Sequence, residues 1–527
     1  MAQFLFGFVR EGYHFYNFTL LFSMNYGLLL RTVIHLRPTQ VYHQIKYRLV
    51  KPQFKVVASP ISVEQLVVSG FKTEPIQRYH CLEGKKFTFL NLSHEFAGWN
   101  YNEYGNLWTY NQNYFDWLNQ PDMSAIEGVY WIDLFNSTLT TNSQLSTLNS
   151  QLSLDPYPIA LRSINWIKFF LRYPETVTKE RLDSLYSQVC LLDKKLEYHL
   201  LANHLLEDSY ALYISAAYFQ DERFLKKATK LLLGQLKEQI LPDGAHYEQS
   251  VMYHCILLDR LLDCINIGER GGVNGTSLRV YASKMLGHLQ SIIYSDGSIP
   301  MVNDAAEGIA PKPEDIFDYA QRLFIKWEPL PLKECGYRRM SNGRMEATVD
   351  VGNITATYQP GHTHADSLNY ELRIDGRPVV VDTGVSTYEK NERRQYERGT
   401  SAHNCVVVDS RNSSEVWGGF RVGRRCNVRW KKEEGRCIEA SHFGFGKECR
   451  RRFEMDDQRF LVEDWFDGEA ISYIHLVEGT NPDVVEIENA IEIEKKECQY
   501  STEYNTFHKG TVLEIHFRGH LKTRIKL

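Results

Sequence analysis

Residues 361–366 read Gly-His-Thr-His-Ala-Asp. If this stretch is an extended strand, its period of two places His362, His364 and Asp366 on one side of the chain. Three titratable groups on one face are costly to bury for packing alone. The stretch therefore predicts a metal site, a proton-transfer site, or both.

Length and composition limit the classes of protein to consider. At 527 residues the chain exceeds what one hydrophobic core usually serves, so two large domains are expected. A hydrophobic content of 43% excludes a disordered chain, and an aromatic content of 13% favours a groove lined with flat side chains. The net charge of -5 argues against a general nucleic-acid binder.

The ten cysteines and the N-terminal sequence indicate the cellular compartment in which the protein is expected. The cysteines show no CxxC pairs, which predicts buried thiols rather than a disulfide framework. The N-terminus lacks the basic region and long apolar core of a signal peptide, and the apolar residues 18–30 are too short to span a bilayer. These features predict a soluble protein, cytoplasmic on sequence alone, with the periplasm as the alternative.

The pattern of apolar residues changes along the chain. From about residue 120 to 330 they recur at helical spacing, as in Ile164, Ile167 and Leu171, and after about residue 335 short β-rich runs alternate with turns. We expect a helical or irregular segment over 1–90, with a helix over 31–50. Antiparallel helical hairpins stacked into a bundle or toroid are expected over 91–333, and an antiparallel β-sandwich over 334–527.

Two polar clusters lie in the helical half. Asn203-His204, with Glu207 on the same helix, begins a helix that runs to about residue 219. An N-cap with acidic residues that complement the helix dipole is the structural alternative.

The second cluster follows the turn Pro242-Asp243-Gly244. It is expected to begin a helix with His246, Gln249 and Tyr253 on one face. A tyrosine that satisfies its hydroxyl in the core is the alternative for Tyr253.

The polar motifs of the chain are, in order, Asn203-His204, Pro242-Asp243-Gly244, Glu248-Gln249-Ser250, Tyr253-His254, residues 361–366, Val381-Asp382-Thr383-Gly384 and Ala402-His403-Asn404. Taken in this order, they resemble the heparinase II/III superfamily of polysaccharide lyases over residues 90–470. The resemblance implies an incomplete (α/α) toroid followed by an antiparallel β-sandwich, with the active site in the cleft between them. It also implies eliminative cleavage of an anionic, uronate-containing polysaccharide, either a glycosaminoglycan or a related bacterial exopolysaccharide.

β-Elimination requires the protein to perform three chemical tasks. The uronate carboxylate must be neutralised, the C5 proton removed, and the leaving oxygen protonated. The resemblance implies that Asn203, helped by His204, neutralises the carboxylate and that Tyr253 is the acid. His362 is the base when proton and leaving group lie on opposite faces of the sugar, and Tyr253 is the base when they share a face. Tyr247 is the alternative catalytic tyrosine, because the spacing after Asn203 is short for the family.

The resemblance also implies a metal site. In metal-containing members the positions of His364, Asp382 and His403 bind one zinc, a sound ligand set for zinc or another divalent cation. A structural role is expected, since elimination needs no hydrolytic water. Asp366 is then the outer partner of a histidine. No organic cofactor is expected.

Substrate contacts are predicted for Glu207, His246, Gln249 and Arg398. Arg398 is expected to grip a carboxylate or sulfate in a bidentate fork, with a surface salt bridge as the alternative. Tyr388 is a candidate platform for stacking a sugar ring.

Two other classes of function remain. One is a catalytically silent polysaccharide-binding protein that keeps the cleft. The other is a glycoside hydrolase that uses carboxylates such as Glu207 with Asp208, or Glu248. Hydrolysis needs two carboxyl groups that oppose each other, and adjacent helix positions do not.

Overall fold

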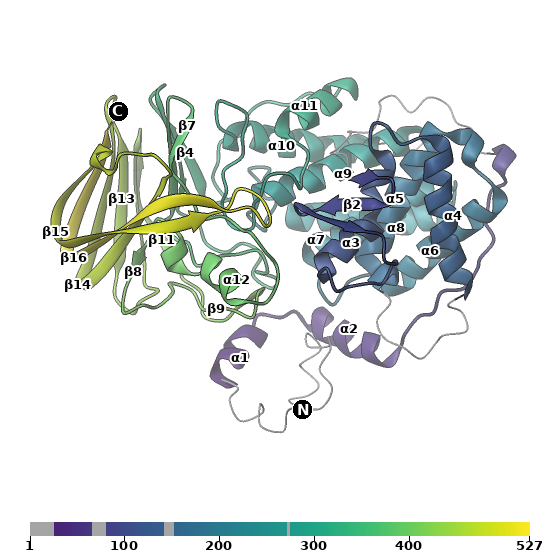
Figure 1. Cartoon of the computed structure of the whole chain (residues 1–527), viewed down its shortest axis with the longest axis horizontal. Helices are drawn as coiled ribbons and strands as arrows, with labels where there is room; N and C mark the ends of the chain where they lie inside the picture. The colour runs from purple at the N-terminus through teal and green to yellow at the C-terminus, as the bar shows by residue number, and fades with distance from the viewer. Residues whose placement is uncertain (1–25, 66–80, 142–151, 271–274, 527) are drawn as a thin grey trace.

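The computed structural model describes residues 26–65, 81–141, 152–270 and 275–526. The N-terminal part of the chain is helical and the C-terminal part is a large curled antiparallel sheet (Figure 1). The predictions made for the first 25 residues lie outside the described part of the chain.

The described part of the chain begins with two helices, where a single helix was expected over 31–50. Helix α1 spans Tyr26–Val33 and α2 spans Pro38–Leu49. Pro38 stands at the first turn of α2, and Arg37 before it is extended with φ -74° and ψ 146°. A proline disfavours helical backbone at the preceding residue, so it begins a new helix here instead of continuing the first.

A small sheet and a layered set of helices follow. The sheet contains β1 (Leu82–Glu83), β2 (Lys86–Phe89) and β3 (Leu92–Glu95) in sequential order. The helices are α3 (Asn106–Tyr114), α4 (Ala125–Thr141), α5 (Pro156–Arg172), α6 (Lys179–Lys195), α7 (Ala202–Tyr218), α8 (Glu222–Gln239), α9 (Val251–Arg270), α10 (Thr276–Ile292) and α11 (Pro313–Arg322).

Helix α7 lies at the centre of this helical part. It packs against α5, α8 and α9, and every residue in it except His204 is buried. A helix that is covered on all sides needs no polar face, which explains its run of Leu, Ala, Tyr and Ile. Its N-terminal end is therefore a rigid support for Asn203 and His204.

The sheet runs in the order β11-β12-β13-β14-β7-β6-β5-β4, and every pairing is antiparallel. The 19-residue β14 also pairs with β8 and β16, and β15 pairs with β16. The register shifts between Phe466 and Glu469, beside Gly468 with φ 149°. An irregularity of this kind bends a long strand, so it contributes to the curl of the sheet.

The strands are β4 (Tyr337–Ser341), β5 (Met345–Asp350), β6 (Tyr370–Ile374), β7 (Arg377–Val380), β8 (Val406–Val407), β9 (Val416–Trp417), β10 (Arg421–Val422), β11 (Val428–Glu434), β12 (Cys437–His442), β13 (Cys449–Met455), β14 (Arg459–Val477), β15 (Val485–Tyr500) and β16 (His508–Lys526). The short helix α12 (Glu392–Glu397) lies between β7 and β8.

Buried polar contacts join the helical part to the sheet. The Gln249 amide donates to the backbone oxygens of Cys335 at 2.8 Å and Asn353 at 3.0 Å. No disulfide links any of the ten cysteines, all of which lie in the described ranges. None of the helices described is both long enough and apolar enough to cross a membrane.

Candidate active site

Three predicted catalytic residues meet where the helical part contacts the sheet part. Asn203 comes from the first turn of α7, Tyr253 from the first turn of α9, and His362 from the irregular connection between β5 and β6. The rings of His362 and Tyr253 face each other with centroids 4.0 Å apart. Nε2 of His362 lies 3.3 Å from the Asn203 amide nitrogen.

Asn203 is held in place by Glu248. Its side-chain amide donates to Oε2 at 2.8 Å, and its backbone N–H donates to Oε1 at 3.1 Å. The two residues before it, Leu201 and Ala202, have positive φ values of 63° and 53°. Such backbone is unfavourable for residues with a Cβ, so the surrounding contacts must hold this turn and aim the Asn203 amide towards His362.

His204 is the one α7 residue that reaches solvent. Its Nδ1 lies 3.1 Å from Oε2 of Glu197. Burial lowers the pKa of His204, but the Glu197 carboxylate more than offsets this, and the net pKa is raised. The Glu197 carboxylate therefore favours the imidazolium form of His204, next to Asn203, up to a higher pH than in a free histidine.

Tyr253 shares a hydroxyl cluster with Tyr388, from the loop that precedes α12. Their hydroxyl oxygens are 3.3 Å apart, and that of Tyr388 lies 3.4 Å from Nδ1 of His362. Burial raises the pKa of Tyr253, so the phenol keeps its proton. Tyr247 instead directs its hydroxyl to Tyr358, at 2.7 Å.

Asp304, which carries no sequence motif, connects the two histidines of residues 361–366. It accepts from Nδ1 of His362 at 2.9 Å and from Nε2 of His364 at 2.8 Å, and Nη2 of Arg394 donates to it at 2.7 Å. Burial raises the pKa of Asp304, but Arg394 and the histidines hold it well below its usual range. Because a carboxylate can only accept, Nδ1 of His362 carries a proton and donates it to Asp304, and Nε2 is the nitrogen on the side of Asn203.

The expectation that residues 361–366 form a strand is wrong. They lie in irregular backbone between β5 and β6. The backbone N–H of His364 donates to Oδ1 of Asn303 at 2.9 Å, and that of Asp304 donates to the His362 carbonyl at 3.2 Å. The segment is thus held against residues 303–304 instead of a neighbouring strand, which no periodicity argument could reveal.

The predicted metal ligands also lie close together. Asp382 accepts from Nδ1 of His403 at 2.8 Å, and the rings of His364 and His403 have centroids 5.3 Å apart. Nδ1 of His364 and Nε2 of His403 are buried without a hydrogen-bond partner. Both are ordinary ligand atoms for a divalent metal, so these two side chains fit such an ion.

Asp382 was expected as a metal ligand and Asp366 as the outer partner of a histidine, but their contacts indicate the reverse. Both Asp382 oxygens are engaged, one with His403 and with the Asn369 amide at 2.6 Å, the other with the Gly384 N–H at 2.9 Å. Oδ2 of Asp366 has no partner. In this arrangement Asp382 orients a histidine, while Asp366 carries the unused oxygen.

Comparison with known proteins places this geometry in a family. A heparinase II/III N-terminus model matches residues 162–326, and a heparinase II/III-like C-terminal model matches residues 326–525. The chain belongs to the heparinase II/III family.

Two curated relatives of this family member are heparin-sulfate lyases. That of Bacteroides thetaiotaomicron is 22% identical over 320 residues, which cover 50% of this chain and 44% of the relative. That of Pedobacter heparinus is 26% identical over 230 residues, which cover 38% of this chain and 34% of the relative. Each match thus spans less than half of the curated relative.

Solved structures show the same heparinase fold. Heparinase III matches with a TM-score of 0.63 at 14% identity, covering 92% of this chain and 89% of that chain. A heparan sulfate lyase from Pedobacter heparinus matches with a TM-score of 0.56 at 16% identity, covering 93% and 88%. At such identities the likeness establishes the fold alone.

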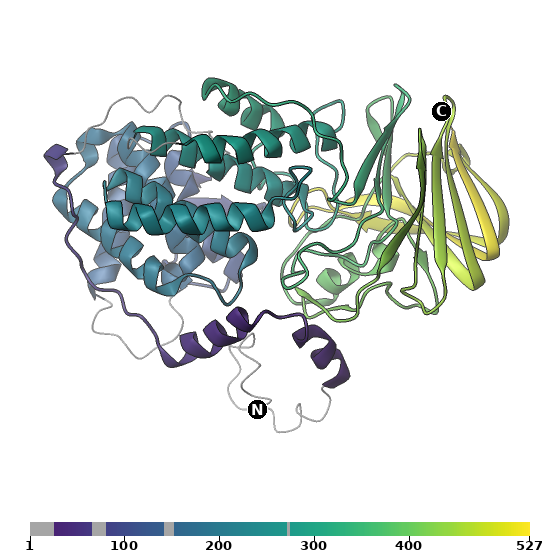
Figure 2. The same cartoon turned by 180° about the vertical axis from the view of Figure 1, so that it is seen from behind.

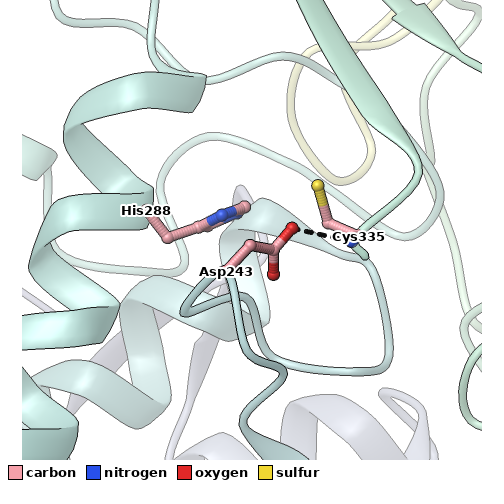
Figure 3. A group of neighbouring side chains, drawn as sticks. All are labelled: Asp243, His288 and Cys335. Carbon is pink, nitrogen blue, oxygen red and sulfur yellow. Dashed lines mark hydrogen bonds between the residues drawn. The ribbon is translucent and has the colours of Figure 1, made fainter. Parts of the chain in front are cut away.

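A second group in this heparinase II/III chain also offers metal donors. Ligand atoms of Asp243, His288 and Cys335, all buried, lie within 4.8 Å of one another (Figure 3). The Asp243 carboxylate already accepts the backbone N–H groups of Lys333 at 3.0 Å and Cys335 at 2.8 Å. Among the residues described, Glu494, Glu514 and His516 are the other set this compact, and the His364, Asp382 and His403 set is more open.

The four predicted substrate contacts are buried and bonded within the protein. Helix α9 begins only at Val251, so His246 and Gln249 precede it instead of sharing its face. His246 donates to Gln239 at 2.9 Å, Arg398 donates to the Thr363 carbonyl at 2.8 Å, and Glu207 lies 4.0 Å from Arg260. These side chains tie segments together and do not line an open surface.

Proposed function

We propose that this protein is a polysaccharide lyase that cleaves a uronic-acid-containing polysaccharide by β-elimination and leaves a 4,5-unsaturated uronate end. The observation that carries the proposal is the convergence of His362, Asn203 and Tyr253. The His362 lone pair, the Asn203 amide and the protonated Tyr253 phenol are the groups that this reaction requires.

Each group has a defined task. Asn203 and the imidazolium of His204 offset the negative charge of the substrate carboxylate, which makes the C5 proton more acidic. Nε2 of His362 takes that proton, and the Tyr253 hydroxyl gives its proton to the departing O4. The raised pKa of Tyr253 supports the role of acid, because the phenol remains protonated at neutral pH.

The substrate class rests on the family and on charge. The curated relatives are named heparin-sulfate lyases, which supports an anionic glycosaminoglycan or a related exopolysaccharide as the substrate. The charged state favoured for His204 suits a ligand that carries a carboxylate.

We include one structural divalent cation, zinc by preference, in this proposal. His364 and His403 would hold it through their unpartnered nitrogens, with Asp366 or Asp382 as the carboxylate. The ion would offset the buried carboxylates of this region and stiffen the loop that carries His362.

A pair of tyrosine variants tests the proposed acid. Tyr253→Phe should lower kcat by about 10²–10⁴-fold, because it removes only the transferable proton. Tyr247→Phe removes a hydroxyl of the same kind that bonds to Tyr358, so it serves as the matched control and should retain activity. The assay is the ultraviolet absorbance of the unsaturated uronate formed on heparan sulfate, heparosan, hyaluronan, chondroitin and alginate.

Three outcomes would contradict the proposal. New reducing ends without new ultraviolet absorbance would indicate a hydrolase. Tight binding without turnover on any uronate polymer would indicate a binding protein. Loss of turnover in Tyr247→Phe but not in Tyr253→Phe would transfer the acid role to the other tyrosine.

A further inference from the structure

Helices α1 and α2 form an arm along one edge of the molecule, and both carry apolar side chains on their outer sides. They lie at the same lower margin in two opposite views (Figures 1 and 2). Leu30 on α1 and Ile34 just after it are 63% and 65% exposed. On α2, Tyr42, Ile45 and Leu49 are 62%, 39% and 77% exposed.

These positions form helical stripes. Leu30 and Ile34 are four residues apart, and Tyr42, Ile45 and Leu49 follow the i, i+3, i+7 pattern of one helix face. Scattered exposed apolar residues are ordinary on a protein surface, but an ordered stripe on each of two successive helices is not. No described part of the chain covers them.

The opposite faces of the helices are attached to the rest of the protein. On α1, Nε of Arg31 pairs with Glu415 at 2.8 Å, and Thr32 accepts from the Trp417 indole at 3.1 Å. On α2, the Gln40 amide donates to the Leu200 carbonyl at 3.3 Å, and the His43 ring stacks on Tyr198 with centroids 4.8 Å apart. The apolar stripes are therefore directed outward by contacts on both helices.

The arm is also strongly basic. Residues 26–56 contain six Lys and Arg residues and no Asp or Glu, in a chain whose net charge is -5. Two of the six, Arg31 and Arg37, pair with Glu415 and Glu238 on the rest of the protein, and the other four are not in these pairs. Lys46 and Arg48 flank the stripe of α2 on its two sides, since they lie one position from Ile45 and Leu49. A helix with an apolar face edged by cations is typical of proteins that lie on an anionic membrane surface.

We propose that this arm docks the protein on an anionic lipid bilayer, with the two apolar stripes in the headgroup region and the basic residues against lipid phosphates. A second copy of the chain is a poorer partner, because it would set one acid-free basic arm against another. An anionic polysaccharide would satisfy the charge, but it offers no hydrocarbon to the five apolar side chains. The inference does not depend on the proposed lyase activity.

Vesicle flotation with the full chain tests this docking. We expect binding to phosphatidylcholine vesicles that contain about one third phosphatidylglycerol, little binding to pure phosphatidylcholine, and weaker binding as salt rises. The double variant Leu30→Glu/Ile34→Glu should bind anionic vesicles at least about tenfold more weakly, since it loses apolar insertion and adds repulsion. Ile126→Glu is the matched control, because Ile126 is 85% exposed on α4, outside the arm, and its loss should leave binding unchanged.

The results separate the lipid from other partners. Thermal unfolding would verify that each variant is folded. Absence of flotation with anionic vesicles, or equal flotation of the double variant and the parent, would overturn the proposal. So would retention on immobilised heparan sulfate that depends on Leu30 and Ile34 when vesicle binding does not.

Discussion

Asp304→Asn is the most informative single substitution, because one carboxylate serves His362, His364 and Arg394. The variant leaves the Arg394 cation buried without its partner, and breaking a buried pair in this way costs about 3–5 kcal/mol of stability. It also changes the tautomer of His362. An amide N–H turned towards Nδ1 favours the proton on Nε2, the atom that we propose as the base. We expect kcat to fall by about 10²–10⁴-fold, equivalent to about 3–5 kcal/mol in the barrier, with a smaller change in KM.

A matched variant separates the two effects. Asp243 is also buried and also accepts hydrogen bonds, but from backbone N–H groups outside the catalytic cluster. Asp243→Asn should therefore lower the free energy of unfolding while the folded enzyme keeps its kcat. Initial rates of unsaturated-uronate formation would be compared below the melting temperature of both variants. A folded Asp304→Asn protein within about threefold of the parent kcat would refute the role given to this carboxylate.

Three further predictions concern charge, metal and backbone. Glu197→Gln removes the carboxylate that raises the pKa of His204, so the imidazolium is lost at lower pH and the alkaline limb of the pH–kcat/KM profile moves to lower pH. His403→Ala removes a buried, otherwise unpartnered nitrogen and should lower the zinc retained per chain, measured by elemental analysis after dialysis. Gly244→Ala, at φ +83° with a backbone oxygen 2.1 Å from the new Cβ, should cost more stability in urea unfolding than Gly297→Ala, at φ +84° with open space.

The change from helices to strands could be predicted from the sequence, because apolar residues recur with a different period in each. The last helix of the helical part ends at Arg322 and the first strand of the large sheet begins at Tyr337, on either side of the predicted change near residue 335. The prediction of a single helix over 31–50 is wrong, because Pro38 disfavours helical backbone at Arg37 and this outweighs the apolar pattern. The predicted start of α9 is wrong, because His246 and Gln249 lie before the helix and contact other segments of the chain.

The site was only partly visible in the sequence. Asn203, Tyr253 and His362 belong to recognisable motifs, and the structure places them together. Asp304 and Arg394 belong to no motif, and their importance comes from a contact across 90 residues of chain. A buried ion pair of this kind depends on tertiary packing, which spacing within a strand or helix does not encode.

His362 and His364 are separated by a single residue, and their side chains are kept apart in a different way from the one that the sequence indicated. On a regular strand the two rings would share a face, and a bulge would be needed to separate a base from a metal ligand. In irregular backbone the two rings instead bond to different oxygens of Asp304. The other nitrogens have different surroundings: Nε2 of His362 lies 3.3 Å from the Asn203 amide nitrogen, and Nδ1 of His364 is buried without a hydrogen-bond partner. One carboxylate thus bonds to one nitrogen of each ring, so the proposed proton transfer at His362 and the proposed metal binding at His364 would not compete for the same nitrogen.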